Sequence, residues 1–95
     1  DVSIMKNICF SIIRKYENAF LTLVTKTAEK VVVNIAISKP LVKNKQLNAA
    51  EMINQVSKHI NGRGGGQSFF AVTSGNNSAG LPALFSDVKK IIKSL

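Results

Sequence analysis

One stretch decides the fold of this chain, Gly62-Arg63-Gly64-Gly65-Gly66-Gln67-Ser68-Phe69-Phe70-Ala71, which holds four of the six glycines around a single arginine. Glycine has no Cβ and accepts positive φ at little steric cost, so this segment can bring bare backbone against a partner. Successive N–H groups in such a segment form a concavity that binds anions, and phosphate is a common occupant. With its two phenylalanines, the stretch offers amides, a cation and aromatic faces within ten positions.

The elements on either side of this stretch exclude two kinds of nucleotide-binding loop. A helix over 48–60 is predicted before it, since Asn48 can cap that helix with Glu51 three residues on. The pair Asn61-Gly62 ends the helix, and a short apolar strand is predicted over Ser68–Thr73. A Walker phosphate loop needs Lys-Ser or Lys-Thr and then a helix, whereas a dinucleotide fingerprint joins a strand to a helix. Neither arrangement is present, so no nucleotide hydrolase is indicated.

The chain before that helix predicts a second helix, a β-hairpin and a connector. Residues 3–18 are predicted to be helical, with Ser3 at the cap and a wide apolar stripe made of Ile4, Met5, Ile8, Cys9, Ile12 and Ile13. The segments Phe20–Thr27 and Val31–Ser38 are rich in β-branched residues and only three residues apart, which predicts a hairpin. The segment Lys39–Gln46 contains a proline and three lysines and is expected to be an irregular connector.

The end of the chain predicts a loop over Ser74–Gly80 and a last helix over Leu81–Leu95, with Pro82 in its first turn. The predicted order is therefore α-β-β-α-β-α. This order indicates an α+β fold, a small single-domain sheet of about three or more strands with helices packed on it. Residues 1–18 are expected to form an N-terminal helix that serves as a linker to a parent protein or as a dimer seam. Residues 19–95 are expected to form the globular domain.

Positive charge is concentrated in the middle of the chain. The 95 residues carry a formal charge of +8. Between Lys30 and Ser86 the only acidic residue is Glu51, against the cations Lys30, Lys39, Lys43, Lys45, Lys58 and Arg63. A basic field of this kind suits a polyanion, either nucleic acid or an anionic membrane surface. The alternative is that the lysines only keep a small domain soluble.

Other features of the whole chain further limit the classes of protein to which it can belong. The single cysteine, Cys9, has no second thiol for a disulfide or a metal site, which fits a reducing, cytoplasmic chain. The longest apolar runs are far shorter than the roughly 20 residues that a membrane helix needs, so no membrane partner is expected. The chain begins with Asp1 and shows no signal pattern, and we interpret it as a piece of a larger protein.

Residues suited to catalysis are sparse. His59 is the only histidine, and it falls at a helix end where a partly buried, structural role is expected. Cys9 and His59 could act as nucleophile and base only if the fold brought them together, which nothing in the sequence indicates. The five carboxylates are scattered, so no acid–base pair and no hard-metal site is visible. The chain is therefore predicted to be non-catalytic and to hold no cofactor or metal of its own.

The stretch Gly62–Ala71 also has a purely structural interpretation. Its glycines could serve a tight helix-to-strand turn, and Arg63 could be solvated. At least one of Phe69 and Phe70 is expected in the core, because side chains alternate along a strand. A turn needs only one or two glycines, however, so three in succession favour close approach of the backbone to a partner.

The segment Gly62–Gly75 resembles the C-terminal domain of alanyl-tRNA synthetase, the DHH-associated domain that is also appended to DHH-type phosphoesterases and exonucleases. The resemblance covers nearly the whole chain, with the strand Val31–Ser38 and the helix Ala49–Ile60 in the family order. The glycine triplet followed by Gln67 and then Phe69-Phe70 is similar to the synthetase branch rather than the phosphoesterase branch.

That resemblance implies a non-catalytic, tRNA-binding tail of an alanine–tRNA ligase. Such a tail would contact the outer corner of tRNA and couple the aminoacylation and editing domains, with ATP and the editing zinc handled upstream in the same polypeptide. The candidate RNA-binding residues are Gly62, Arg63, Gly64, Gly65, Gly66, Gln67, Ser68, Phe69, Lys43, Lys45 and Lys58. Two alternatives stay open: an oligonucleotide- or nucleotide-binding domain of a DHH-type phosphoesterase, and a homodimerisation module that uses the helix Ile4–Tyr16.

Overall fold

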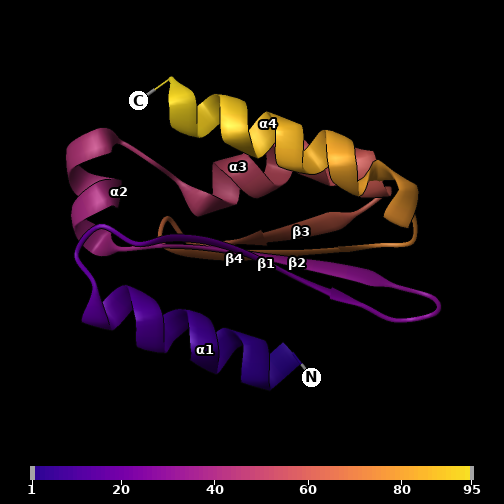
Figure 1. Ribbon diagram of the computed structural model, residues 1–95, viewed down its shortest axis with the longest axis horizontal. Coiled ribbons are helices and arrows are strands. Elements are labelled where there is room, and N and C mark those ends of the chain that lie inside the picture. The colour runs from indigo at the N-terminus through magenta and orange to yellow at the C-terminus, as the bar shows by residue number, and fades with distance from the viewer. Residues whose placement is uncertain (1, 95) are drawn as a thin grey trace.

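The computed structural model describes residues 2–94 and is built on a four-stranded antiparallel sheet in the order β1-β2-β4-β3 (Figure 1). The strands β1 (Phe20–Lys26) and β2 (Val31–Ile37) form the predicted hairpin. On the other side of β2 lies β4 (Phe70–Gly75), and beyond it lies β3 (Arg63–Gly66). The sheet therefore has β1 and β3 as its two free edges.

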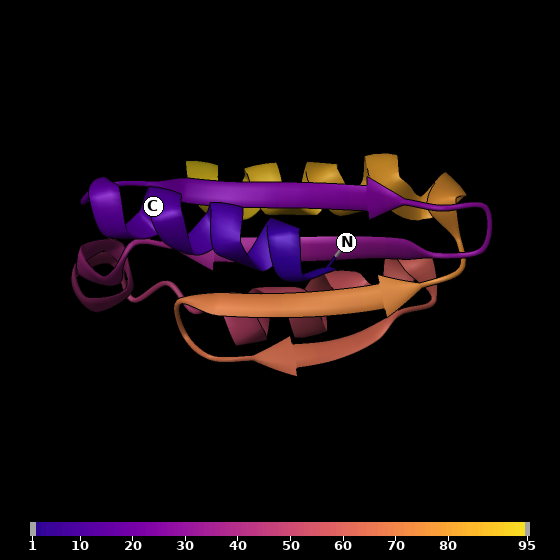
Figure 2. The ribbon, with the colours of Figure 1, turned by 90° about the horizontal axis from the view of Figure 1, so that it is seen from below.

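Helices cover both faces of this sheet. They are α1 (Val2–Lys15), α2 (Lys39–Lys45), α3 (Ala49–Val56), the short 3₁₀ helices η1 (Ser57–Ile60) and η2 (Ser78–Gly80), and α4 (Leu81–Lys93). Figure 1 shows α3 and α4 on one face and α1 alone on the other, with α2 at one end of the sheet. Seen from below in Figure 2, α1 runs along the sheet. The molecule thus has three layers, with the sheet in the middle.

The predicted α+β class with helices packed on a sheet is confirmed, and the structure adds two elements to the predicted order. The segment Lys39–Gln46 is not an irregular connector, because most of it forms α2. Pro40 lies in the first turn of α2, where its missing N–H is tolerated, and Gln46 ends the helix in the left-handed conformation with φ of 56°. The second addition is β3, which lies inside the glycine stretch. The full order is α-β-β-α-α-β-β-α.

The boundaries of the other elements differ from the predicted ones by a few residues. α1 ends at Lys15 rather than 18, and Ser3 lies in its first turn rather than at its cap. The strand predicted over Ser68–Thr73 is β4 and begins two residues later, because a turn precedes it in which the N–H of Gln67 donates to the carbonyl of Phe70 at 2.8 Å. Leu95, predicted in the last helix, lies outside the described residues.

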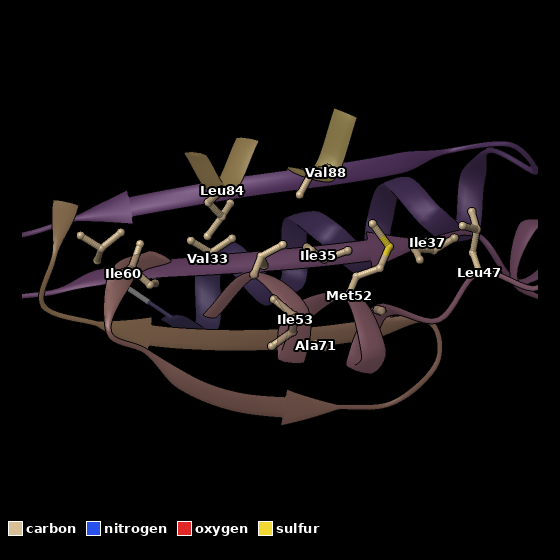
Figure 3. Close-up of a cluster of buried hydrophobic side chains, with 13 residues drawn as sticks. Val33, Ile35, Ile37, Leu47, Met52, Ile53, Ile60, Ala71, Leu84 and Val88 are labelled. Carbon is tan, nitrogen blue, oxygen red and sulfur yellow. The ribbon is translucent and has the colours of Figure 1, made fainter. Parts of the chain in front are cut away.

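The core lies between the sheet and the pair α3 and α4 (Figure 3). One face of β2 supplies Val31, Val33, Ile35 and Ile37 to it, as the alternating pattern predicts. The helical residues that pack on this face are Ala49, Met52, Ile53, Val56, Ile60, Leu84 and Val88. At the start of α3, the side chain of Asn48 accepts a hydrogen bond from the N–H of Glu51 at 3.1 Å, which confirms the predicted cap. Full burial of one such aliphatic side chain contributes about 1.5–3 kcal/mol, so this layer dominates the stability.

The opposite face of the sheet is smaller and more polar, and α1 covers it. Asn34, Ala36 and Ser38 are all fully buried there, and Cys9 of α1 is fully buried against them. The hydroxyl of Ser38 accepts from the N–H of Ala19 at 3.0 Å and donates to the carbonyl of Tyr16 at 2.5 Å. These bonds hold the end of α1 against the sheet, so α1 forms one of the three layers of the molecule.

Candidate nucleic-acid interface

The glycine stretch supplies an exposed edge strand. All four residues of β3 are exposed, and in the sheet β3 pairs only with β4. Residues that face each other in an antiparallel pair alternate between hydrogen-bonded and non-hydrogen-bonded positions. Since Gln67 is bonded to Phe70, the next bonded position along β3 is Gly65, opposite Val72. The peptide N–H and C=O groups of Gly64 and Gly66 therefore point away from β4, toward the free edge.

The three consecutive glycines differ in what the fold requires of them. A Cβ at Gly64 would lie 1.9 Å from the carbonyl oxygen of Val72, and one at Gly66 would lie 2.4 Å from that of Phe70. Both positions thus need glycine because β4 approaches so closely. A Cβ at Gly65 would meet no atom within 4 Å, and φ at this residue is not positive. Neither packing nor backbone conformation requires a glycine at position 65, which leaves bare surface there.

Three phenylalanines gather beside this bare surface. The ring of Phe10, on α1, lies 5.0 Å from the ring of Phe70 and 6.1 Å from that of Phe69. The expectation that at least one of Phe69 and Phe70 belongs to the core is wrong, because both are only half-buried and neither is among the buried core residues. Phe70 pairs with Ala36 and so shares the sheet face that α1 covers, while Phe69 lies in the turn before β4.

Cations lie over these rings. The ammonium of Lys6 is 5.6 Å from the ring centre of Phe10, and the Arg14 guanidinium is 5.5 Å from the same ring. The ammonium of Lys39, at the start of α2, is 5.5 Å from the ring centre of Phe69. Each such contact contributes about 0.5–1 kcal/mol at an exposed site and holds the positive charge close to the aromatic surface. We call Lys6, Phe10, Arg14, Lys39, Phe69 and Phe70 the cation–aromatic surface.

Two hollows open on the cation–aromatic surface. The smaller has a volume of about 260 Å³ and is lined by Lys6, Phe10, Gly65, Gly66, Gln67, Phe69 and Phe70. The larger has a volume of about 450 Å³ and lies where the end of α1 meets the start of α2. Both hollows include Phe10 and Phe69 in their linings, so the two are neighbours. A ligand bound at the glycine edge can therefore continue into the larger hollow.

The structure brings together only part of the predicted site. Gly65, Gly66, Gln67 and Phe69 line the smaller hollow. Ser68 is half-buried, and its carbonyl accepts from the N–H of Ala49 at 2.8 Å, so its backbone holds the start of α3. These five residues form the part of the predicted site near the turn.

The other predicted residues lie apart from that turn. Arg63 is the first residue of β3, Gly62 precedes it and Lys58 lies in η1, so these three lie at the opposite end of β3 from Gln67. Lys43 and Lys45 are exposed on α2 and line neither hollow. None of the predicted cations lines either hollow, whereas Lys6 lines the smaller one together with Gly65 and Gly66.

Sequence reasoning missed Lys6, Phe10, Arg14, Lys39 and Phe70 as site residues. A signal for three of them was available, because Lys6, Phe10 and Arg14 recur every fourth residue and so lie on one flank of α1.

The one histidine has a structural role. Nε2 of His59 lies 2.6 Å from Oδ2 of Asp87, which joins η1 to α4. The hydrogen bond from His59 holds the pKa of Asp87 below its ordinary value, and burial raises the pKa of the Cys9 thiol. Among residues 2–94, no three His, Cys, Asp or Glu side chains come close enough to share a metal ion. Over the same residues, no helix is long and apolar enough to cross a membrane.

Comparisons with known proteins give consistent matches. The family model described as the DHHA1 domain matches residues 1–94. The chain is 33% identical to the alanine–tRNA ligase of Christiangramia forsetii over 93 residues, which are 98% of this chain and 11% of that protein. It is 34% identical to the alanine–tRNA ligase of Cytophaga hutchinsonii, also over 98% of this chain and 11% of that protein. The chain thus spans about a tenth of the length of these curated relatives.

A solved structure shares the fold. The C-Ala domain from Aquifex aeolicus alanyl-tRNA synthetase superposes with a TM-score of 0.80, over 90% of this chain and 75% of that chain. Its sequence identity to this chain is 24%, so this likeness supports the architecture alone. The same arrangement of sheet and helices therefore exists in an experimentally determined domain.

Proposed function

This chain belongs to the DHHA1 domain family, and on that premise we propose that it is the tRNA-binding C-terminal domain of an alanine–tRNA ligase. Two alanine–tRNA ligases match it over nearly its whole length, which favours this parent over a DHH-type phosphoesterase. In this proposal the domain contacts the outer corner of tRNA and helps the aminoacylation and editing domains act on one substrate. Aminoacylation, with its ATP, and editing, with its zinc, belong to other domains of the parent in the cytoplasm.

The observation that carries the proposal is the bare position at Gly65 between the outward-facing peptide groups of Gly64 and Gly66. An RNA phosphate can approach this edge without meeting a side chain. The outward-facing N–H groups can donate to its oxygens, and Lys6 supplies a positive charge to the lining of the same hollow. The formal charge of +8 draws a polyanion toward this surface. Contacts of this kind recognise the RNA backbone and its shape rather than base edges.

The substitution Gly65→Val tests this proposal without a change of fold, because the space around Gly65 is open. Valine would hold the RNA backbone away from the edge. Hydrogen bonds to a charged group contribute about 1.5–3 kcal/mol each, so the dissociation constant for tRNA should rise about 10- to 100-fold. Ser86→Val is the matched control, since Ser86 is exposed on α4 at the opposite face of the sheet. Equal tRNA affinity of wild type and Gly65→Val would show that the glycine edge is only a structural strand.

A second candidate function, homodimerisation, is favoured by the flank of α1 that carries Ile4 and Ile8 and points away from Phe10. Because successive helical residues are 100° apart, Ile8 and Phe10 point to opposite sides of the buried Cys9. Ile8 is 43% exposed and Ile4 is 57% exposed, so this flank presents apolar surface. It lies on the helix that contacts β1, the second free edge of the sheet. A twofold pairing of two β1 edges would place two such flanks on the same face of an extended sheet.

Sedimentation of the purified chain tests this second function. A dimer should dissociate on Ile8→Asp and persist with Ser86→Asp, which adds the same charge at an exposed position of α4 on the other face of the sheet. A monomer at high concentration would refute dimerisation by this flank.

A further inference from the structure

The larger hollow is lined by aromatic and charged side chains that take no part in the proposed contact between the RNA backbone and the glycine edge. Its volume is about 450 Å³, and it is lined by Phe10, Ile13, Arg14, Tyr16, Glu17, Lys39, Pro40 and Phe69. We propose that this hollow receives one unpaired nucleobase of the bound RNA. This inference rests on the proposed function and adds to it the kind of RNA structure that the domain selects.

The size of the hollow favours a single base. Pockets that enclose small molecules have volumes of about 300–1,000 Å³, so this hollow lies toward the lower end of that range. A base or nucleoside fits such a volume, whereas a base-paired helix does not enter it. The RNA therefore has to present a base that is not held in a duplex, as in a loop or a bulge.

The aromatic and cationic groups of the hollow match the two parts of a nucleotide. Phe10, Tyr16 and Phe69 supply aromatic side chains to the lining, and Arg14 supplies a guanidinium; both kinds of group stack on nucleobases in RNA complexes. Tyr16 is 51% exposed, so its ring is accessible. The charges of Arg14 and Lys39 can hold the phosphates on either side of the inserted base.

Glu17 adds a hydrogen-bond acceptor to this basic surface. It lines the larger hollow and takes part in no ion pair within the part of the chain that the structure describes. A carboxylate accepts hydrogen bonds from the amino groups of bases, as it does from the amino group of cytosine in DNA complexes. The hollow therefore favours a base with an amino group over uracil.

The neighbouring hollows give the RNA a continuous path. Phe10 and Phe69 line both of them, with Gly65 and Gly66 on one side and Pro40 on the other. A strand whose phosphates contact the glycine edge can place its next base against these rings. The two hollows then bind adjacent parts of one RNA segment.

The test compares two RNAs that differ only in pairing. One is a hairpin with an unpaired 2-aminopurine in its loop, and the other is a duplex of the same length with that base paired. Stacking on an aromatic side chain contributes to affinity by a factor of about 5 to 150 per base. The wild-type chain should prefer the hairpin by a factor in this range, and the fluorescence of 2-aminopurine should fall on binding.

Two substitutions in the lining, with one matched control, assign that preference to the larger hollow. Tyr16→Leu and Phe69→Leu should each reduce the preference for the hairpin toward one, and Tyr16 is exposed enough that its replacement preserves the fold. Phe85→Leu is the matched control, since Phe85 is 37% exposed on α4, and it should keep the preference. Glu17→Ala should reduce the preference for a loop guanosine over a loop uridine.

The outcomes separate this inference from the function on which it rests. If the chain binds hairpin and duplex equally, or if both Tyr16→Leu and Phe69→Leu keep the full preference, the base pocket is refuted while RNA binding stands. If the chain binds neither RNA at low salt, both the pocket and the proposed function are refuted.

Discussion

The substitutions Gly64→Ala and Gly65→Ala should have opposite effects on stability, although the two glycines are adjacent. A methyl group at position 64 would lie 1.9 Å from the oxygen of Val72 and 2.6 Å from the Cα of Thr73, so β3 has to move away from β4. Overpacking of this kind costs about 1–3 kcal/mol. At position 65 the added methyl group meets no atom within 4 Å. There it stabilises by about 0.4–1 kcal/mol, because alanine restricts the unfolded chain more than glycine does.

The two variants should therefore differ by roughly 1.5–4 kcal/mol in free energy of unfolding. With a urea m-value of about 1–2 kcal/mol/M, their unfolding midpoints should be at least about 0.75 M apart. Far-UV circular dichroism is a suitable signal, since the chain has no tryptophan and a single tyrosine. Midpoints that coincide would refute the reasoning that β4 imposes glycine at 64 while the fold leaves 65 free.

Two further predictions concern the rest of the fold. Asn34→Leu should raise the free energy of unfolding, measured in urea, by about 1–3 kcal/mol. The reason is that Asn34 is fully buried and both polar atoms of its side chain lack a partner among residues 2–94. A loss of stability would show that the amide has a partner in solution. Asp87→Asn should lower stability at pH 6, with a loss that shrinks as the pH falls below about 4. The reason is that the pKa of Asp87 is lowered in the folded state, so its contribution is complete above the unfolded pKa and disappears as the pH falls through the folded one. A gap between wild type and variant that is the same at pH 6 and pH 3 would contradict this account of the His59–Asp87 contact.

The core could be predicted because its signals are local. The alternation of Val31, Val33, Ile35 and Ile37 and the stripe on α3 each follow from the period of one element. The helix α2 was missed because none of its residues is buried, so its sequence carries no apolar stripe. Patterns of hydrophobicity detect elements that fully bury a face, and α2 has only Leu41 and Val42 packed partly against the core.

The candidate site was harder to predict because it is assembled from distant segments. Phe10 belongs to α1, yet its ring neighbours are Phe69 and Phe70, and only the packing of α1 on the sheet brings them together. The three glycines illustrate the same limit, since identical neighbours in sequence have different surroundings. Contact with β4 requires glycine at 64 and 66, and no contact requires it at 65.

The dependence of tRNA affinity on salt tests the central claim most directly. If the glycine edge and the cations near it neutralise about three to five phosphates, log K for the wild-type chain should fall with log salt at a slope of roughly −2 to −4. The double variant Lys6→Ala and Arg14→Ala should lose about two phosphate contacts, so the slope should become less negative by roughly 1.5–2. The matched double variant Lys89→Ala and Lys90→Ala on α4 should leave the slope nearly unchanged. The absence of binding at low salt, or a slope near zero, would contradict the proposed function.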